Sequence, residues 1–151
     1  MKRLGTLIAA LLTLAVTTAH AEGFLWGPQG GFSLEPSQVV FGFHAVAPVT
    51  DRFDIVPSFD IGIGDDVFTF ALNGDVRMNL APESNLKPYV GAGASFYSVD
   101  YDGDVETATD VGFGIGGGIW LNKGGQTSYY IDAKVGIENA PDFKAMLGIN
   151  F

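Results

Sequence analysis

The chain has 151 residues, with 17 acidic and 8 basic side chains, a formal net charge of −9 and no cysteine. The absence of cysteine excludes disulfides, thiolate metal sites and a cysteine nucleophile. The acidic balance argues against nucleic-acid binding, which requires basic patches on the protein surface.

Residues 1–21 have the features of a secretory signal peptide. Lys2 and Arg3 form a short basic region, an apolar stretch runs from Leu7 to Val16, and Ala19-His20-Ala21 fits an A-x-A cleavage site. The apolar stretch is too short for a transmembrane helix. We therefore expect this leader to be removed, which leaves six basic residues against 17 acidic ones and a net charge of −11.

Residues 22–151 are expected to form one domain of eight strands. Eight segments alternate apolar and polar side chains with the two-residue period of a β-strand. The first is the least regular, because it contains Pro28 and the pair Gly30-Gly31. In chain order, we place the strands at residues 28–34, 38–47, 52–64, 67–80, 87–99, 111–121, 127–138 and 142–151.

The middle segments show the alternation well. In the segment at 52–64, Phe59 and Ile61 lie on one face and Asp54 and Asp60 on the other. The segment at 67–80 opposes apolar residues to a face with Thr69, Asn73, Asp75, Arg77 and Asn79. Each segment therefore has one oily and one polar face.

The last three segments repeat the pattern. The segment at 111–121 carries four glycines on its polar face, and the one at 127–138 carries Tyr130, Asp132 and Lys134 there. The final segment has the length that a tilted strand needs to cross a membrane, about 9–11 residues. Its apolar face consists of Phe143, Ala145, Leu147, Ile149 and Phe151.

Alternation alone does not say which face points outward. A water-soluble barrel such as a lipocalin would turn the oily face inward. Here the apolar faces are long and nearly uncharged, the polar faces carry glycine runs, and the sequence ends in Phe151. We therefore predict an all-β fold, an eight-stranded antiparallel up-and-down transmembrane β-barrel with the polar face inside.

Basic and acidic residues fall in different connections between the predicted strands. Arg52, Lys87 and Lys123 fall in the second, fourth and sixth connections, whereas the other four contain acidic residues without Lys or Arg. With an even number of strands, alternate connections lie on the same side of the membrane. We expect the basic connections and both termini in the periplasm and the acidic connections outside the cell.

Two stretches resemble the small eight-stranded outer-membrane barrels of the porin-family, opacity-like, OmpX/OmpW type. They are Tyr89-Val90-Gly91-Ala92-Gly93-Ala94 and the closing Leu147-Gly148-Ile149-Asn150-Phe151. The resemblance covers residues 22–151 but rests on pattern more than on signature. It implies a Gram-negative outer membrane, and Phe151 as the signal read by the barrel-insertion machinery. The short connections depart from relatives with long adhesive loops.

The polar face defines the candidate site, a barrel lumen. If Asp65-Asp66 is a two-residue hairpin, Asp54 faces Arg77, and a confined charge needs a partner, so we predict an ion pair. Separate hydration of both charges is the alternative. The glycines at 111–121 leave room for Tyr89, Tyr97 and Tyr130, which predicts a filled lumen. Further polar residues expected in the lumen are His44, Asp60, Asp75, Asp132, Lys134 and Lys144.

An acidic connection is the weakest candidate site. Asp100, Asp102, Asp104 and Glu106 offer oxygen ligands of the kind that Ca²⁺ prefers, without matching the EF-hand pattern. A solvated acidic loop is the preferred interpretation, with loose cation bridging to lipid phosphates as a hypothesis. We expect no dedicated metal site and no cofactor.

The expected role is that of an integral outer-membrane protein with a structural or surface-interaction function and a packed polar lumen. A narrow channel for small solutes is the alternative. A lipid-modifying enzyme ranks lower, because His44 is the one histidine after the leader and no G-x-S-x-G motif occurs. We expect no enzymatic activity, a monomer, and outer-membrane lipid, lipopolysaccharide and the insertion machinery as partners.

Overall fold

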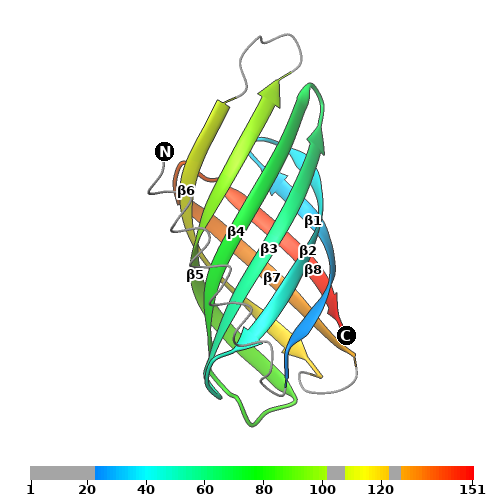
Figure 1. Ribbon diagram of the computed structural model, residues 1–151, viewed down its shortest axis with the longest axis vertical. Helices are drawn as coiled ribbons and strands as arrows, with labels where there is room; N and C mark the ends of the chain where they lie inside the picture. Colours follow the sequence, from blue (N-terminus) through cyan, green and yellow to red (C-terminus); the bar gives the residue numbers. More distant parts are fainter. Residues whose placement is uncertain (1–22, 102–107, 123–126) are drawn as a thin grey trace.

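The computed structural model describes residues 23–101, 108–122 and 127–151 as a single closed barrel (Figure 1). Each strand pairs antiparallel with the next in the sequence, and β1 pairs with β8 to close the ring. The strands are β1 Leu25–Leu34, β2 Gln38–Pro48, β3 Phe53–Gly64, β4 Val67–Asn79, β5 Leu86–Tyr101, β6 Ala108–Leu121, β7 Ser128–Glu138 and β8 Phe143–Asn150.

All eight predicted segments correspond to strands, so the predicted fold class is confirmed. The largest differences lie at strand ends. β1 begins at Leu25, three residues before the expected Pro28, and β6 begins at Ala108 instead of residue 111. Pro28, which cannot donate a hydrogen bond to the ladder, lies within β1 and does not begin it. Backbone hydrogen bonds between Trp26 and Phe151 keep the residues before Pro28 in the strand.

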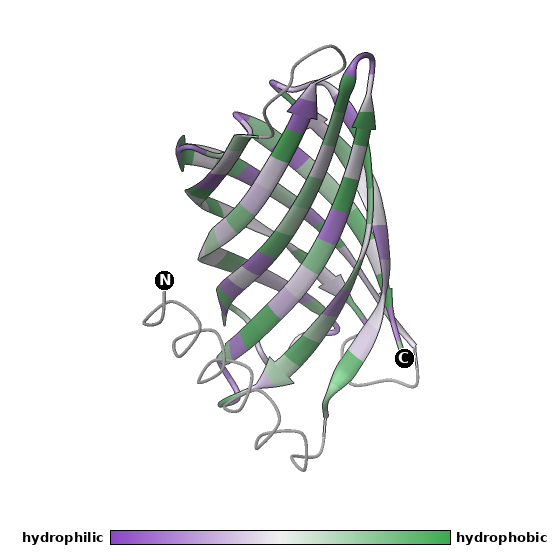
Figure 2. Cartoon of the chain, turned by 45° about the horizontal axis from the view of Figure 1, so that its top comes forward, coloured by the Kyte–Doolittle hydropathy of each residue, from purple (hydrophilic) through white to green (hydrophobic). Residues whose placement is uncertain are grey.

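The barrel is inside-out relative to a soluble protein, as predicted. Apolar and polar residues alternate along the strands in Figure 2. Apolar side chains on the outer face stay exposed, for example Phe41 at 57%, Ile131 at 53% and Leu147 at 60%. Polar groups are instead buried inside, among them Asp54, Asp60 and Arg77. No helix within the described ranges is long and apolar enough to span a bilayer.

The two ends of the barrel differ. The terminal end contains the start of β1, the end of β8 and the turns at 49–52 and 80–85. The hairpin end contains the connections at 35–37, 65–66 and 139–142. The strands β3 to β6 are the longest, with 12, 13, 16 and 14 residues, and they reach furthest at the hairpin end (Figure 1).

β6 extends beyond its partner β7 at the hairpin end. The β6–β7 register ends at Phe113, which leaves the residues from Ala108 to Gly112 without a β7 neighbour. An open strand edge invites pairing with another chain. Here the Asp110 carboxylate accepts a hydrogen bond of 2.7 Å from the backbone N–H of Val111. This side chain occupies one of the donors that a foreign strand would need.

Candidate functional site: the closed lumen

Aromatic rings close the lumen near the terminal end. Trp120 and Tyr130 are 0% and 1% exposed, and their ring centroids lie 5.0 Å apart. Tyr89 packs on Trp120 at 5.5 Å. Val46 on β2 and Val56 on β3, 0% and 1% exposed, belong to the same buried cluster. These five side chains form a layer that we call the aromatic floor.

Glycines on the wall make space for the rings. A Cβ on Gly118 of β6 would lie 2.7 Å from the Tyr89 ring, and a Cβ on Gly148 of β8 would meet the Tyr130 ring. Real side chains do not approach so closely, so only glycine fits beneath each ring. The predicted packing of rings on the β6 glycines is confirmed for Tyr89, whereas Tyr130 lies over β8.

Arg77 lies at the centre of the floor. Its guanidinium carbon is 4.9, 5.5 and 5.1 Å from the ring centroids of Tyr89, Trp120 and Tyr130. Cation–π attraction is stronger at desolvated sites, and the Arg77 side chain is only 6% exposed. An Nη2–carboxylate distance of 2.9 Å joins Arg77 to Asp132, which also accepts a hydrogen bond of 2.7 Å from the Tyr89 hydroxyl.

The predicted opposition of Asp54 and Arg77 is found in the register of β3 and β4. The ion pair described for Arg77, however, is with Asp132 on β7, across the lumen. Asp54 accepts a hydrogen bond of 2.9 Å from Asn79 and is 1% exposed. An energetic coupling between Asp54 and Arg77 therefore stays a prediction. Hairpin register relates residues on neighbouring strands only, whereas a closed barrel also brings together side chains from strands that are not neighbours.

His44 faces the lumen, as its parity predicted, and is 4% exposed. Its Nε2 lies 2.5 Å from the Asn150 side-chain oxygen, and its ring meets Tyr130 edge-on at 4.9 Å. The cross-strand neighbour of His44 is Ser58, whose hydroxyl accepts a hydrogen bond from Asn73. This arrangement ties the histidine into the floor instead of pairing it with a serine nucleophile.

Two lysine–aspartate pairs occupy the lumen above the floor. Lys134 Nζ lies 2.5 Å from Asp75, and Lys144 Nζ lies 2.5 Å from Asp60. Both lysine side chains are 18% exposed, against 6% for Arg77. The three basic residues of the strand interiors therefore all point inward and each meets a carboxylate. Ionic groups in a confined space need such partners.

Amide side chains connect the charges into one network. Asp60 accepts hydrogen bonds from Gln29 at 2.5 Å and from Asn73 at 2.7 Å. Gln29 also accepts a hydrogen bond from the Tyr130 hydroxyl, which links the upper charges to the floor. Asn73 accepts a hydrogen bond of 2.7 Å from Ser95. Asn73 lies on the inner face, as the alternation of its segment predicted, whereas Gln29 was not predicted, and inward parity was the signal that could have identified it.

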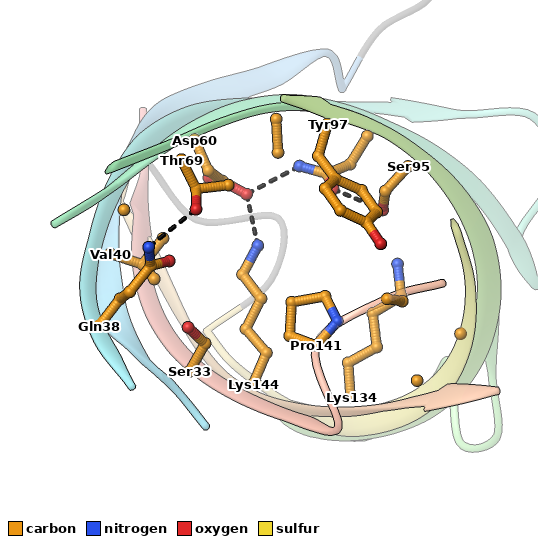
Figure 3. A pocket seen from close by; sticks show the side chains of 16 residues that line it. Ser33, Gln38, Val40, Asp60, Thr69, Ser95, Tyr97, Lys134, Pro141 and Lys144 are labelled. Atoms are coloured by element: carbon orange, nitrogen blue, oxygen red, sulfur yellow. Dashed lines mark hydrogen bonds and ion pairs between the residues drawn. The ribbon is translucent and has the colours of Figure 1, made fainter. Parts of the chain in front are cut away.

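A cavity of about 60 Å³ lies at the hairpin end of the lumen. Figure 3 shows Lys134, Lys144, Asp60 and Tyr97 around it, with Pro141 between the two lysines. We call this space the vestibule. One ordered water needs about 10–15 Å³ of such volume, so the vestibule has room for a few waters. Its wall also includes Ser33, Gln38, Thr69, Asn73 and Ser95.

The acidic cation candidates lie almost wholly beyond the described residues. Asp102, Asp104 and Glu106 fall in 102–107, and Asp100 is exposed on β5. No cluster of three or more potential metal-binding His, Asp or Glu residues occurs in the part of the chain that the structure describes. Residues 1–21, the expected leader, also fall outside it.

No protein-family model and no curated protein sequence matches the chain. Solved structures do. The N-terminal barrel domain of Pseudomonas aeruginosa OprF is 17% identical, with a TM-score of 0.71 over 85% of this chain and 95% of that one. Neisserial surface protein A is 13% identical, with a TM-score of 0.65 over 85% and 96%.

A third structure extends the comparison to an enterobacterium. The outer membrane protein Ail of Yersinia pestis in a phospholipid bilayer nanodisc is 13% identical, with a TM-score of 0.54 over 86% of this chain and 99% of that one. At identities this low, the likeness shows a shared fold and does not extend to activity. The chain has the fold of the small eight-stranded outer-membrane β-barrels.

Proposed function

We propose that the protein is an integral outer-membrane barrel whose lumen is closed to solutes and whose role is structural or interactive at the cell surface. The exposed apolar outer wall and the structural neighbours support membrane integration. In such a role the lumen stabilises the barrel, and the surface connections meet partners. Outer-membrane lipid and lipopolysaccharide are the proposed surroundings of a monomer inserted by the barrel-insertion machinery.

The aromatic floor carries the proposal of a closed lumen. The interior of an eight-stranded barrel is just wide enough to be filled by side chains or to hold one small ligand. Here Trp120, Tyr130, Val46 and Val56 are each at most 1% exposed and belong to one buried cluster inside the barrel. A solute would have to displace these rings together with the Arg77–Asp132 pair. The enzymatic alternative has no comparable support, because His44 and Ser58 engage Asn150 and Asn73.

Planar-bilayer conductance of the refolded protein tests the closure. The wild type should give no discrete current steps, and Trp120→Ala should introduce them by removing the largest ring of the floor. Trp26→Ala is the matched control, because Trp26 is 53% exposed on the outer wall. Steps of equal size and frequency in the wild type and Trp120→Ala would contradict a closed lumen.

A narrow channel is the second candidate, and one observation favours it. Smaller cavities of about 30 and 10 Å³ continue from the vestibule down to Arg77 and Asp132. They share the lining residues Asp75 and Lys134. Water-sized spaces thus reach the floor from the hairpin end. Wild-type steps in the conductance experiment would select this candidate.

The proposed orientation places the hairpin end outside the cell and the terminal end in the periplasm. The support is the acidic character of the hairpin-end connections and the position of Arg52 and Lys87 at the other end. Single cysteines can test it, because the chain has none of its own. On intact cells, an impermeant thiol reagent should label Asp65→Cys and miss Ser84→Cys. Labelling of Ser84→Cys alone would show that the barrel has the opposite orientation.

A further inference from the structure

The connection from β7 to β8 does not continue the barrel wall. Pairing of β7 with β8 ends at Val135 and Phe143, whereas β7 stays paired with β6 as far as Glu138. The register of β6 and β7 shifts between Phe113 and Gly114, which marks a bulge. β-Bulges bend a strand locally. The four residues that follow, 139–142, leave the sheet and cross the mouth of the lumen.

Two glycines form a seat for this segment. A Cβ on Gly136 of β7 would lie 2.6 Å from the Pro141 carbonyl oxygen and 2.7 Å from that of Ala140. A Cβ on Gly112 of β6 would lie 2.9 Å from the Ala140 Cβ and would also overlap the Asn139 carbonyl. The backbone of 139–141 therefore rests directly on wall positions that lack side chains.

The segment covers the vestibule. Ala140 and Pro141 line the cavity together with Lys134 and Lys144, and Figure 3 shows Pro141 inside the ring of strands between the two lysines. Both residues are half-buried. The same cavity is lined by the charged groups of Asp60, Lys134 and Lys144 and by the side chains of Ser95 and Tyr97. Those groups prefer contact with water or with a polar solute.

Few polar contacts hold the segment in its seat. Gly136 N–H donates to the Asp142 carbonyl at 3.3 Å, and the Asn139 amide donates to Asp110 at 3.4 Å. Both distances exceed the usual 2.7–3.2 Å of N–H···O bonds. In the part of the chain that the structure describes, no salt bridge involves residues 139–142. Packing on two glycines is thus its main attachment.

We propose that residues 139–142 are a lid, which closes the vestibule from the hairpin end and can leave its seat to expose Lys134 and Lys144 to small polar solutes. This inference goes beyond the proposed function, since it concerns access from one end only. A lid can open while the aromatic floor stays shut. The barrel would then present a blind, polar pocket with two ammonium groups to the medium on that side.

The test measures how fast a charged thiol reagent reaches a cysteine inside the vestibule. Ser95→Cys is the reporter, because Ser95 lines the cavity and the chain has no other cysteine. Gly136→Val and Gly112→Val each place a side chain where the lid now rests. Gly74→Val is the control, because a Cβ at Gly74 on the outer wall has no atom within 4 Å.

In detergent micelles, Gly136→Val and Gly112→Val should each raise the labelling rate of the reporter at least tenfold over the Gly74→Val control. Heat-dependent migration on gels confirms that every variant is folded before labelling. The two lid variants act from different strands, so one suffices if the other does not fold. Labelling rates within twofold of the control in the folded lid variants would overturn the lid. Conductance plays no part, so failure here leaves the closed floor untouched.

Discussion

The floor and the vestibule occupy the same lumen but stabilise their positively charged side chains in different ways. At the floor, Arg77 has three aromatic rings and one carboxylate around it and is almost inaccessible to water. In the vestibule, Lys134 and Lys144 each contact one carboxylate beside a cavity that has room for a few waters. The difference follows the properties of the cations, since a guanidinium stacks on rings and is weakly hydrated, whereas an ammonium is a strongly hydrated point charge.

The comparison has an energetic consequence. A charge sealed from water depends entirely on its protein partners, so losing one partner is costly. A charge beside water can recover part of its solvation. The floor should therefore dominate stability, while the vestibule should tolerate change and respond to salt. The four predictions below test this contrast.

The largest effect is expected for Arg77→Ala. It removes a buried guanidinium, whose side chain is 6% exposed, from the centre of the floor and leaves Asp132 without its cation. Breaking a buried ion pair typically costs about 3–5 kcal/mol. Urea unfolding of the barrel in lipid vesicles measures the loss. A loss under about 1 kcal/mol, as for surface pairs, would show that the floor is hydrated after all.

A double-mutant cycle sharpens the same result. The coupling energy of Arg77 with Asp132 should exceed its coupling with Asp54, because the 2.9 Å contact is with Asp132. The cycle with Asp54→Ala also tests the pair predicted from the register. Equal coupling energies would mean that Arg77 interacts as strongly with Asp54 as with Asp132.

The second prediction concerns the wall that encloses both regions. Leu147→Arg places a charge on the lipid-facing side of β8, where Leu147 is 60% exposed. Near the bilayer midplane such a change costs about 2–4 kcal/mol. Folding yield and urea stability in vesicles measure it. Wild-type behaviour of this variant would mean that the apolar wall does not face lipid.

The third prediction separates the floor from ordinary glycine positions. Gly148→Ala inserts a methyl group against the Tyr130 ring, which Trp120 and His44 hold in place. Overpacking of this kind costs about 1–3 kcal/mol. Gly74→Ala is the control and should be nearly neutral, since open space surrounds its Cβ. Equal stabilities of the two variants would show that the aromatic floor rearranges to accommodate the added methyl group without cost.

The smallest effect is expected for Lys134→Met in the vestibule. The Lys134 side chain is 18% exposed beside the vestibule, against 6% for Arg77, so water there can replace part of the lost contact with Asp75, and the cost should be about 1 kcal/mol. The destabilisation should shrink at high salt, which screens partly exposed pairs. Unfolding titrations at low and high salt measure both. A salt-independent loss as large as that of Arg77→Ala would erase the distinction between the two regions.

The eight strands and their inward faces could be read from the sequence, because strand side chains alternate with a period of two. The placement of Asp54 opposite Arg77 followed from a two-residue hairpin at Asp65-Asp66 and agrees with the register. The inward positions of His44, Lys134 and Lys144 followed from the same parity. These are local properties, set by a residue and its neighbours on adjacent strands.

Partners across the lumen depended on tertiary structure. Asp132 reaches Arg77 from the other side of the barrel, Lys144 reaches Asp60 from β8 to β3, and the lid rests on Gly112 and Gly136. Parity states that a side chain points inward, but not which of the inward groups it meets. That choice is made only when the barrel closes, because the curvature and tilt of the closed sheet set the distances across its interior.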